Sequence, residues 1–364
     1  MSKAKPTSSS GEISSQTIIL AGIAWAAIAL LFYLLLSAPT EVQAFGGSAR
    51  PIWYRIGTYI FQTVAIVFSS FLCLRNWRSP KIISGRNVWL GLGFGIMAWG
   101  IGNLAFAYQD FNYQHQLTQN LDSLSQIVSR QKNTPHLTEA FEKKKITDNK
   151  TILDLIKEKD IDKLAPALKT FGQDFSSKVP TLPQEMEKIA KNLSDLPTTF
   201  PSYADIFFTL TYVFLAWGMA MSVIGRRLNL FPKQWGIVAL VAVFGLAAGG
   251  YVTFLAGNVV GDVKFDIGKV LNTIYALGDV WLLIVAAVLL LAFWGGKAAQ
   301  SWRLIGGAAI AMFIGDLGFA FSSKSPNYQS GDWIEFFWIL AFVLWGVGAA
   351  LEFDISSRPT SRRR

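Results

Sequence analysis

The sequence is poor in the residues that build disulfide frameworks and most metal centres. Its 364 residues include a single cysteine, Cys73, and two histidines, His115 and His136. One cysteine excludes an intrachain disulfide framework and a cysteine metal site. The histidines lie in polar sequence, without the His-x-x-x-His spacing or acidic pairing typical of zinc sites. No histidine falls in an apolar run, so His-ligated haem is excluded there, and we expect no metal and no cofactor.

Charge is also scarce. Charged residues make up 16% of the chain, against about 25% in soluble domains. Hydrophobic residues reach 52%, with 13 Trp and 27 Phe. This composition excludes an ordinary soluble globule and is typical of a membrane protein with aromatic belts at its interfaces.

Motifs for nucleotide and nucleophile chemistry are missing as well. The sequence has no phosphate loop and no serine-nucleophile motif in a workable context. GLGFG at 91–95 resembles the start of a nucleotide-binding glycine pattern, but it lies inside an apolar run. We therefore expect a protein that is not an enzyme.

Eight apolar runs approach the roughly 20 residues that a bilayer requires. They lie at 17–37, 56–74, 87–108, 204–224, 235–256, 270–294, 304–321 and 333–352. The predicted fold class is an all-α, polytopic membrane helical bundle. Its parts are a tail at 1–16, spans one to three at 17–108, a polar insert at 109–200, spans four to eight at 201–352 and a basic tail at 353–364.

The short connections alternate in basic charge. One side carries Lys3, Lys5, Arg75, Arg78, Lys81, Arg86, Arg226, Arg227, Lys233, Lys297, Arg303, Arg358, Arg362, Arg363 and Arg364. The other side carries Arg50, Arg55, Lys264, Lys269 and Lys324. The positive-inside rule then predicts that both termini are cytoplasmic and that the insert lies outside. The net charge of +9 is therefore explained by basic residues in the cytoplasmic connections and tails. We expect no nucleic-acid partner.

The insert at 109–200 is polar, with apolar residues at helical spacing, as in Leu117, Leu121 and Leu124. Its first helix is predicted to continue from the third span. Thr151 is placed to cap a helix that begins at Ile152, and a later helix is predicted around 184–194. The pattern predicts a bundle of three or four helices outside the membrane.

The spans that run inward begin alike. The fourth opens YADIFFTLTY, the sixth YALGDVWLL and the eighth GDWIEFFWIL. Among the outward spans, WLGLGFGIMAWGIGNLAFAY resembles WRLIGGAAIAMFIGDLGFAF, which matches Asn103 with Asp316. The pattern indicates repeated hairpins in parallel orientation, unlike the inverted repeats of many secondary transporters.

These repeats carry carboxylates near the outer ends of apolar helices. Asp279 and Asp316 are predicted to belong to a ligand or proton site in an outward-open pocket, with Asn103, Tyr275 and Tyr251 nearby. The two acids are expected to be protonated or to form hydrogen bonds with Tyr275, Asn103 or a backbone donor. An interhelical bond without a pocket is the other interpretation of these two acids.

Three further acids, Asp205, Asp332 and Glu335, are predicted at the outer rim. They lie at the beginnings of their helices, where the dipole and unpaired N–H groups favour a carboxylate. Their simpler interpretation is therefore as helix caps.

PSYADIFFTLTY, IYALGDVWLLIVAAVLLL and the GDLGFAF-to-WIEFFWIL hairpin resemble the multi-span sensory membrane region found ahead of bacterial diguanylate cyclases. The resemblance covers 85–108 and 201–352 and implies a sensing or interaction bundle. We expect no output domain after Arg364, and the insert is foreign to that pattern. The polar insert also resembles multi-pass proteins of cyanobacteria.

We therefore expect a non-enzymatic integral membrane protein with a sensing or accessory (assembly) role. Its expected partners are the lipid bilayer, another membrane or extracytoplasmic protein bound through 109–200, and a small-molecule ligand. The expected location is a bacterial inner membrane, or a thylakoid membrane if the source is a cyanobacterium. The alternative is a secondary transporter, proton-linked through Asp279 or Asp316.

Overall fold

The computed structural model describes residues 14–42, 44–46, 48–130, 135–146, 150–158, 160–196, 201–224, 230–255, 267–292, 299–323 and 328–357. Within these ranges, eight helices are long and apolar enough to cross a membrane. They agree with the eight spans expected from the sequence. The chain therefore has the architecture of an integral multi-pass membrane protein.

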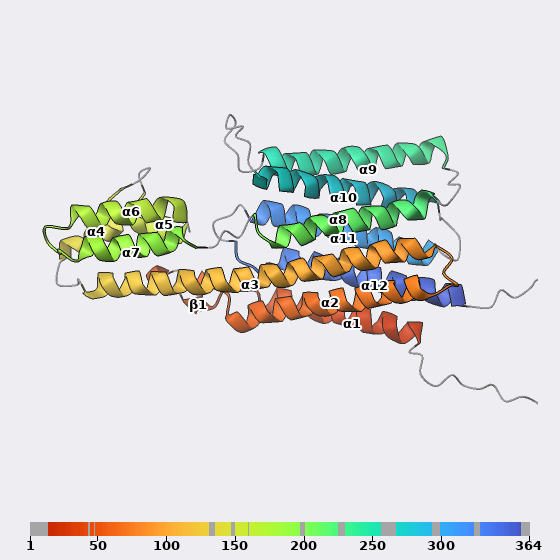
Figure 1. The fold of residues 1–364 in the computed structure, drawn as a ribbon, viewed down its shortest axis with the longest axis horizontal. Coiled ribbons are helices and arrows are strands. Elements are labelled where there is room, and N and C mark those ends of the chain that lie inside the picture. Colours follow the sequence, from red (N-terminus) through yellow and green to blue (C-terminus); the bar gives the residue numbers. More distant parts are fainter. Residues whose placement is uncertain are drawn as a thin grey trace, which may run out of the picture.

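The eight helices alternate in direction along one bundle (Figure 1). They are α1 (Ser15–Leu36), α2 (Ile52–Arg78), α3 (Arg86–Arg130), α8 (Ala204–Ile224), α9 (Pro232–Gly250), α10 (Ile267–Ala292), α11 (Ala299–Ser322) and α12 (Phe336–Ser357). A π-helical turn, η2 (Tyr251–Leu255), extends α9, and a 3-10 turn, η3 (Trp333–Glu335), precedes α12. The beginning of α1 and the end of α12 lie at the end of the bundle opposite the insert (Figure 1).

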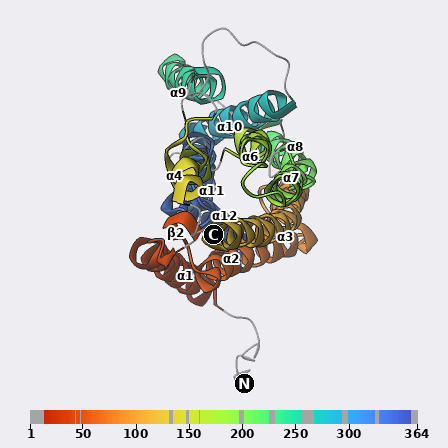
Figure 2. The ribbon, with the colours of Figure 1, turned by 90° about the vertical axis from the view of Figure 1, so that its left-hand side faces the viewer.

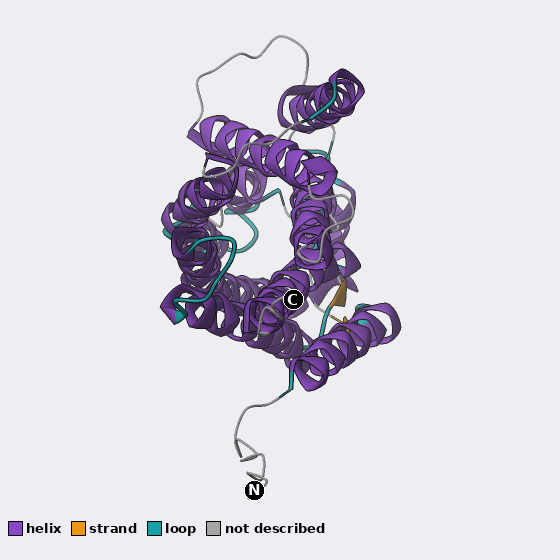
Figure 3. Cartoon of the chain, turned by 90° about the vertical axis from the view of Figure 1, so that its right-hand side faces the viewer, coloured by secondary structure: helices purple, strands orange, loops and turns teal. Residues whose placement is uncertain are grey.

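Six of these helices form a closed ring, seen end-on in Figure 2 and Figure 3. Around the ring, α2 packs against α3, α3 against α8, α8 against α10, α10 against α11, α11 against α12, and α12 against α2. Helix α1 lies outside the ring against α12 and α2, and α9 lies outside it against α10. The two outer helices carry strongly exposed apolar residues such as Leu35 (72%) and Leu240 (69%). Such faces fit a hydrocarbon environment.

The half of the ring away from the insert is filled by large apolar side chains. Trp89 at the start of α3 and Trp302 at the start of α11 are fully buried, as are Met219 and Leu289 from α8 and α10. Two backbones also come into direct contact there. A Cβ atom on Gly218 would lie 2.9 Å from the backbone oxygen of Val88. This end of the ring is therefore closed by packing.

Helices α2 and α12 run in parallel in a constant register. Gln62 contacts Glu335, Ser69 donates to the backbone oxygen of Phe342, and Asn76 donates to that of Ala349, each across a separation of 273 residues. The positions 62, 69 and 76 recur at the heptad spacing of a coiled coil. Small polar residues of this kind act as interhelical hydrogen-bond donors in membrane bundles.

The insert is a separate helical unit at one end of the bundle (Figure 1). It contains α4 (Pro135–Lys143), α5 (Ile152–Lys157), α6 (Ile161–Asp174) and α7 (Leu182–Ser194). They pack against the distal part of α3, which runs unbroken from the bundle into the insert, as expected. The expected cap is also present: Thr151 and Asp154 form a reciprocal capping box at α5. Four helices plus the end of α3 complete this unit.

One small element departs from the expected all-α class. The segment between α1 and α2 forms a hairpin of two-residue strands, β1 (Glu41–Val42) and β2 (Ser48–Ala49), around a 3-10 turn, η1 (Ala44–Gly46). Phe45 in this turn stacks on Phe141 of α4, with ring centroids 5.4 Å apart. The hairpin thereby attaches the α1–α2 connection to the insert.

Candidate functional site: an acidic cavity inside the helix ring

A cavity of about 760 Å³ extends from the middle of the helix ring to the insert. All six ring helices contribute to its wall, as do η2 and the 328–330 segment before η3. Glu158 and Asp160 of the insert also line it. Its volume lies in the roughly 300–1,000 Å³ range of small-molecule sites. The insert therefore borders the same cavity that the ring encloses.

The deepest polar group joins three helices. Tyr212 of α8 contacts Oδ1 of Asp279 on α10 at 2.9 Å and also contacts Oδ2 of Asp316 on α11. Trp338 of α12 donates its indole N–H to Oδ1 of Asp316 at 2.7 Å. Tyr212 and Asp279 are buried, at 5% and 4% exposure. Asp279 and Asp316 thus share one tyrosine hydroxyl.

A tyrosine hydroxyl has one proton to donate. It can donate to only one of the two carboxyl groups, so the other contact requires a proton on the second carboxyl group. The Tyr212 cluster (Tyr212, Asp279 and Asp316) therefore holds a shared proton when both contacts are hydrogen bonds.

A second tyrosine–aspartate pair lies beside the first. Tyr275 of α10 donates to Oδ1 of Asp205 on α8 at 2.7 Å, and its ring lies 5.7 Å from that of Tyr212. The other oxygen of Asp205 accepts the backbone N–H of Ser202 at 2.6 Å. Asp205 therefore serves both as a capping group at the start of α8 and as an interhelical acceptor in the cavity wall.

Glu335 closes the α2–α12 side of the cavity. It is 4% exposed and accepts hydrogen bonds from the Tyr328 hydroxyl and the Gly331 N–H, both at 2.8 Å. Burial and the adjacent Glu335 carboxylate raise the pKa of the Tyr328 hydroxyl well above its ordinary value. Tyr328 therefore remains a hydrogen-bond donor at neutral pH. Of the expected rim acids, Glu335 and Asp205 line the cavity.

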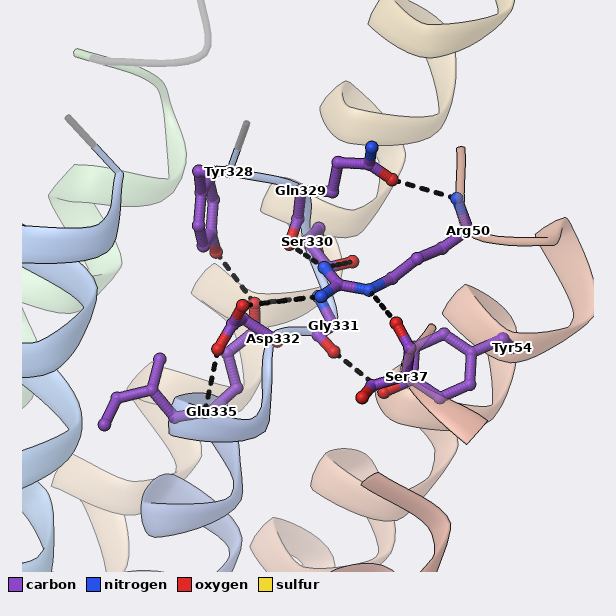
Figure 4. Close-up of polar contacts among 10 residues, drawn as sticks. Ser37, Arg50, Tyr54, Tyr328, Gln329, Ser330, Gly331, Asp332 and Glu335 are labelled. Atoms are coloured by element: carbon purple, nitrogen blue, oxygen red, sulfur yellow. Dashed lines mark hydrogen bonds and ion pairs between the residues drawn. The ribbon is translucent and has the colours of Figure 1, made fainter. Parts of the chain in front are cut away.

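Asp332 lies outside the cavity wall and has a structural role. It caps η3 by accepting the N–H of Ile334, and it forms an ion pair with Arg50 at 3.4 Å. Figure 4 shows Arg50 also donating to the backbone oxygens of Ser37 and Gln329. The cap interpretation of Asp332 is therefore confirmed, and Arg50 fixes the segment that leads into α12.

Of two other residues predicted for the pocket, Asn103 lies in the cavity wall and Tyr251 does not. Asn103 lines the cavity at 5% exposure, and its side-chain nitrogen has no hydrogen-bond partner within the described residues. Tyr251 is 55% exposed and does not line the cavity, although Gly249, Val252 and Thr253 do. The placement of Tyr251 in the pocket is wrong, because its side chain leaves the π-helical turn on a different side from those neighbours.

The expected partners of Asp279 also need correction. Tyr275 donates its hydrogen bond to Asp205 instead. The side chain that contacts Asp279 is Tyr212. Sequence reasoning missed Tyr212 and Trp338. Each follows a carboxylate within two turns, in ADIFFTLTY and DWIEFFW. That recurrence of acid and aromatic residues was the available signal.

The acids nearest the insert have basic partners. Asp110 pairs with Arg55 in a contact in which both side chains are nearly buried, at 8% and 12% exposure. Glu158 pairs with Lys150, and Asp160 lies 3.6 Å from Lys163. The deeper acids Asp205, Asp279, Asp316 and Glu335 receive only uncharged donors in the part of the chain that the structure describes.

The two histidines do not join a site. His115 is an exposed residue of α3 beside Gln119, and the side chain of His136 lies outside the described residues. Among the described residues, no group of three His, Cys, Asp or Glu side chains could hold a metal ion. Comparisons with known protein families, curated proteins and solved structures gave no match.

Proposed function

We propose that this protein is a non-enzymatic membrane receptor or accessory protein that binds a small ligand in the ring cavity. The observation that carries this proposal is the cavity itself, which is enclosed by six helices, lined by buried acids and bordered by the insert. Convergent polar groups in a concave, largely apolar wall are the usual features of a ligand site.

In the proposed orientation, the cavity opens to the extracytoplasmic side. Arg75, Arg78, Lys81 and Arg86 all lie around the connection from α2 to α3, at the end opposite the insert. Basic residues favour the cytoplasmic face. Both termini are then cytoplasmic and the insert is outside, in a bacterial inner membrane or, for a cyanobacterial protein, a thylakoid membrane.

The sensing or accessory role is favoured by the closed end of the ring. Trp89 and Trp302 fill the half away from the insert, so the cavity has one accessible end. A receptor needs access from one side only, whereas a transporter needs both. The resemblance to sensory membrane regions points the same way.

The insert is the proposed contact with a protein partner. Helix α3 lines the cavity through Asn103 and Asp110 and continues without a break into the insert. A ligand that shifts this helix would also move the insert. Occupancy could in this way pass to a membrane or extracytoplasmic partner.

We also propose that α3–α8 and α11–α12 are two copies of one hairpin. Gly218 of α8 packs on the backbone of Val88 and Leu92, and Gly348 of α12 packs on Ser301 and Ile305. Val88 and Leu92 correspond to Ser301 and Ile305 in the alignment that matches Asn103 with Asp316. Both helix pairs place acids of corresponding position, Asp205 and Glu335, in the cavity wall.

Cysteine labelling from the two sides of the membrane tests the proposed access. Cys73 is fully buried, so the natural chain gives a low background. Ser323, an exposed residue of the cavity wall, is changed to Cys, and Lys81, exposed at the opposite end, is changed to Cys as its matched control. We expect a membrane-impermeant maleimide added outside intact cells to label S323C and not K81C. Labelling of K81C alone would overturn the orientation and the outward-open cavity.

The partner role requires a separate experiment. The full chain and a variant that lacks 113–198 are purified gently from the native membrane, and co-eluting proteins are identified by mass spectrometry. We expect a stoichiometric partner with the full chain that is lost from the variant while the bundle still elutes as a folded species. Equal recovery of the partner with both would remove the insert from this role.

A secondary transporter remains a second candidate because of one observation. The proton shared by Tyr212, Asp279 and Asp316 lies between three helices and could be exchanged during a conformational cycle. Proton uptake by vesicles containing the protein, abolished in Asp279→Asn, would favour transport over sensing.

A further inference from the structure

We propose that the ring cavity binds an organic cation that also carries a hydroxyl or carbonyl group. This inference rests on the proposed function, since it names the ligand class of the same cavity. Three independent features of the described residues support it: the charge of the wall, its aromatic side chains and the unpartnered amide of Asn103.

The charge of the cavity wall is one-sided. Seven acids line it, and no Lys or Arg belongs to its described lining. The three acids near the insert already have basic partners, whereas the four deeper ones have only uncharged donors. A carboxyl group in a low-dielectric site either holds a proton, as one of the Tyr212 cluster does, or stays ionised beside a positive charge. A cationic ligand would supply that charge.

The wall is also rich in aromatic rings, which distinguishes it from a site for a metal ion. Trp99 packs beside Phe208 and Trp338, with centroid distances of 4.8 and 5.7 Å. Phe319 lies 5.4 Å from Trp338. Ring faces attract ammonium groups, most strongly when they are desolvated. A bare Ca²⁺ or Mg²⁺ ion needs six or more oxygen ligands at close range, and a cavity of about 760 Å³ is far too large for one.

Asn103 indicates that the ligand also carries a hydrogen-bond acceptor. Its side chain lines the cavity, is 5% exposed, and has an amide nitrogen without a partner among the described residues. A buried unpaired donor is unfavourable and is normally satisfied by protein, water or ligand. Since an ammonium group cannot accept this hydrogen bond, a hydroxyl or carbonyl oxygen elsewhere in the ligand is the expected acceptor.

The test measures binding to the purified full chain in nanodiscs of neutral lipid. The cationic probes are choline, acetylcholine and ethanolamine. Each is compared with its uncharged isostere: 3,3-dimethyl-1-butanol, 3,3-dimethylbutyl acetate and 1-propanol. Equilibrium dialysis gives the affinity, and unfolding followed by tryptophan fluorescence gives the Tm shift. We expect at least one cation to bind and to raise Tm, with no comparable effect from its isostere.

Matched variants locate the binding. Asp279→Asn and Asp316→Asn preserve shape and are expected to weaken the cation's affinity by about 10- to 100-fold, the range for a charged hydrogen-bond partner. Asp122→Asn, an exposed acid of α3 away from the cavity, should leave affinity unchanged. Asn103→Ala should weaken choline but not tetramethylammonium, which has no hydroxyl group. Elution volume and Tm without ligand check that each variant is folded.

Binding of the isosteres as tightly as the cations would overturn the inference, and so would unchanged affinity in both aspartate variants. Absence of binding by all three cations would also overturn it. If S323C is nevertheless labelled from outside, the outward-open cavity stands and only the ligand class is wrong. If S323C is not labelled, the proposed function fails with it.

Discussion

The hydroxyl group of Tyr212 lies between the carboxyl groups of Asp279 and Asp316, 2.9 Å from Oδ1 of the former and in contact with Oδ2 of the latter. The three residues come from α8, α10 and α11, so one hydroxyl connects three walls of the ring. Because it has a single proton, the arrangement stores a second proton on a carboxyl group.

Tyr212→Phe should destabilise the bundle. The substitution keeps the ring but leaves buried Asp279 and half-buried Asp316 without their shared hydroxyl group, at an expected cost of about 1–3 kcal/mol. Thermal unfolding in nanodiscs measures this loss. Tyr251→Phe is the control, because Tyr251 is 55% exposed, and it should change the Tm little. Equal Tm values for the two variants would contradict the bridging role of Tyr212.

Gly218→Ala should separate α3 from α8. A Cβ atom there would lie 2.9 Å from backbone atoms of both Val88 and Leu92, and a backbone cannot move aside as a side chain can. Overpacking of this kind costs about 1–3 kcal/mol. Gly236→Ala in α9, with nothing within 4 Å, should be neutral or stabilising, since alanine favours helix. The difference in Tm between the two alanine variants measures the contact.

Arg55→Met should be far more damaging than Lys143→Met. Arg55 pairs with Asp110 where both side chains are nearly buried, whereas Lys143 and Glu139 are 73% and 59% exposed. Loss of one partner of a buried pair costs about 3–5 kcal/mol, whereas an exposed pair is worth about 0–1 kcal/mol. Chemical denaturation of both variants measures the two costs. Similar losses would show that the Arg55–Asp110 pair is effectively solvated.

The insert should lose stability in acid through its capping box. Hydrogen bonds from the Thr151 backbone N–H and hydroxyl lower the pKa of Asp154 below its ordinary value, which is about 3.9. Because the folded pKa is depressed, the contribution is fully present above the ordinary value and is lost as pH falls through the folded one. The hydrogen-exchange protection of α5, measured relative to the intrinsic rate at each pH, should therefore fall more between pH 5 and pH 3 in the natural chain than in Asp154→Asn. An equal fall of protection in the two would exclude this carboxylate as the cause.

The spans could be predicted from sequence because hydrophobic length is a local property. Each apolar run sets a helix of membrane length, and the polar segment from 109 to 200 cannot remain in lipid. The cap at Thr151 is likewise a local signal. The inward faces of the spans could not be predicted in the same way, because both the core and the lipid side of a membrane helix are apolar, so hydrophobic periodicity gives no direction.

The sequence by itself identified Asp279, Asp316 and Asn103 as polar groups in apolar runs, where such a group needs a partner. It placed Asp205 and Glu335 only at the outer rim, as capping acids. Only the tertiary structure decided how they pair. Closure of the ring brings Tyr212 between Asp279 and Asp316, gives Tyr275 to Asp205 and leaves Tyr251 outside. Helix rotation and neighbour choice depend on packing between segments far apart in the chain, and no short stretch of sequence contains that information.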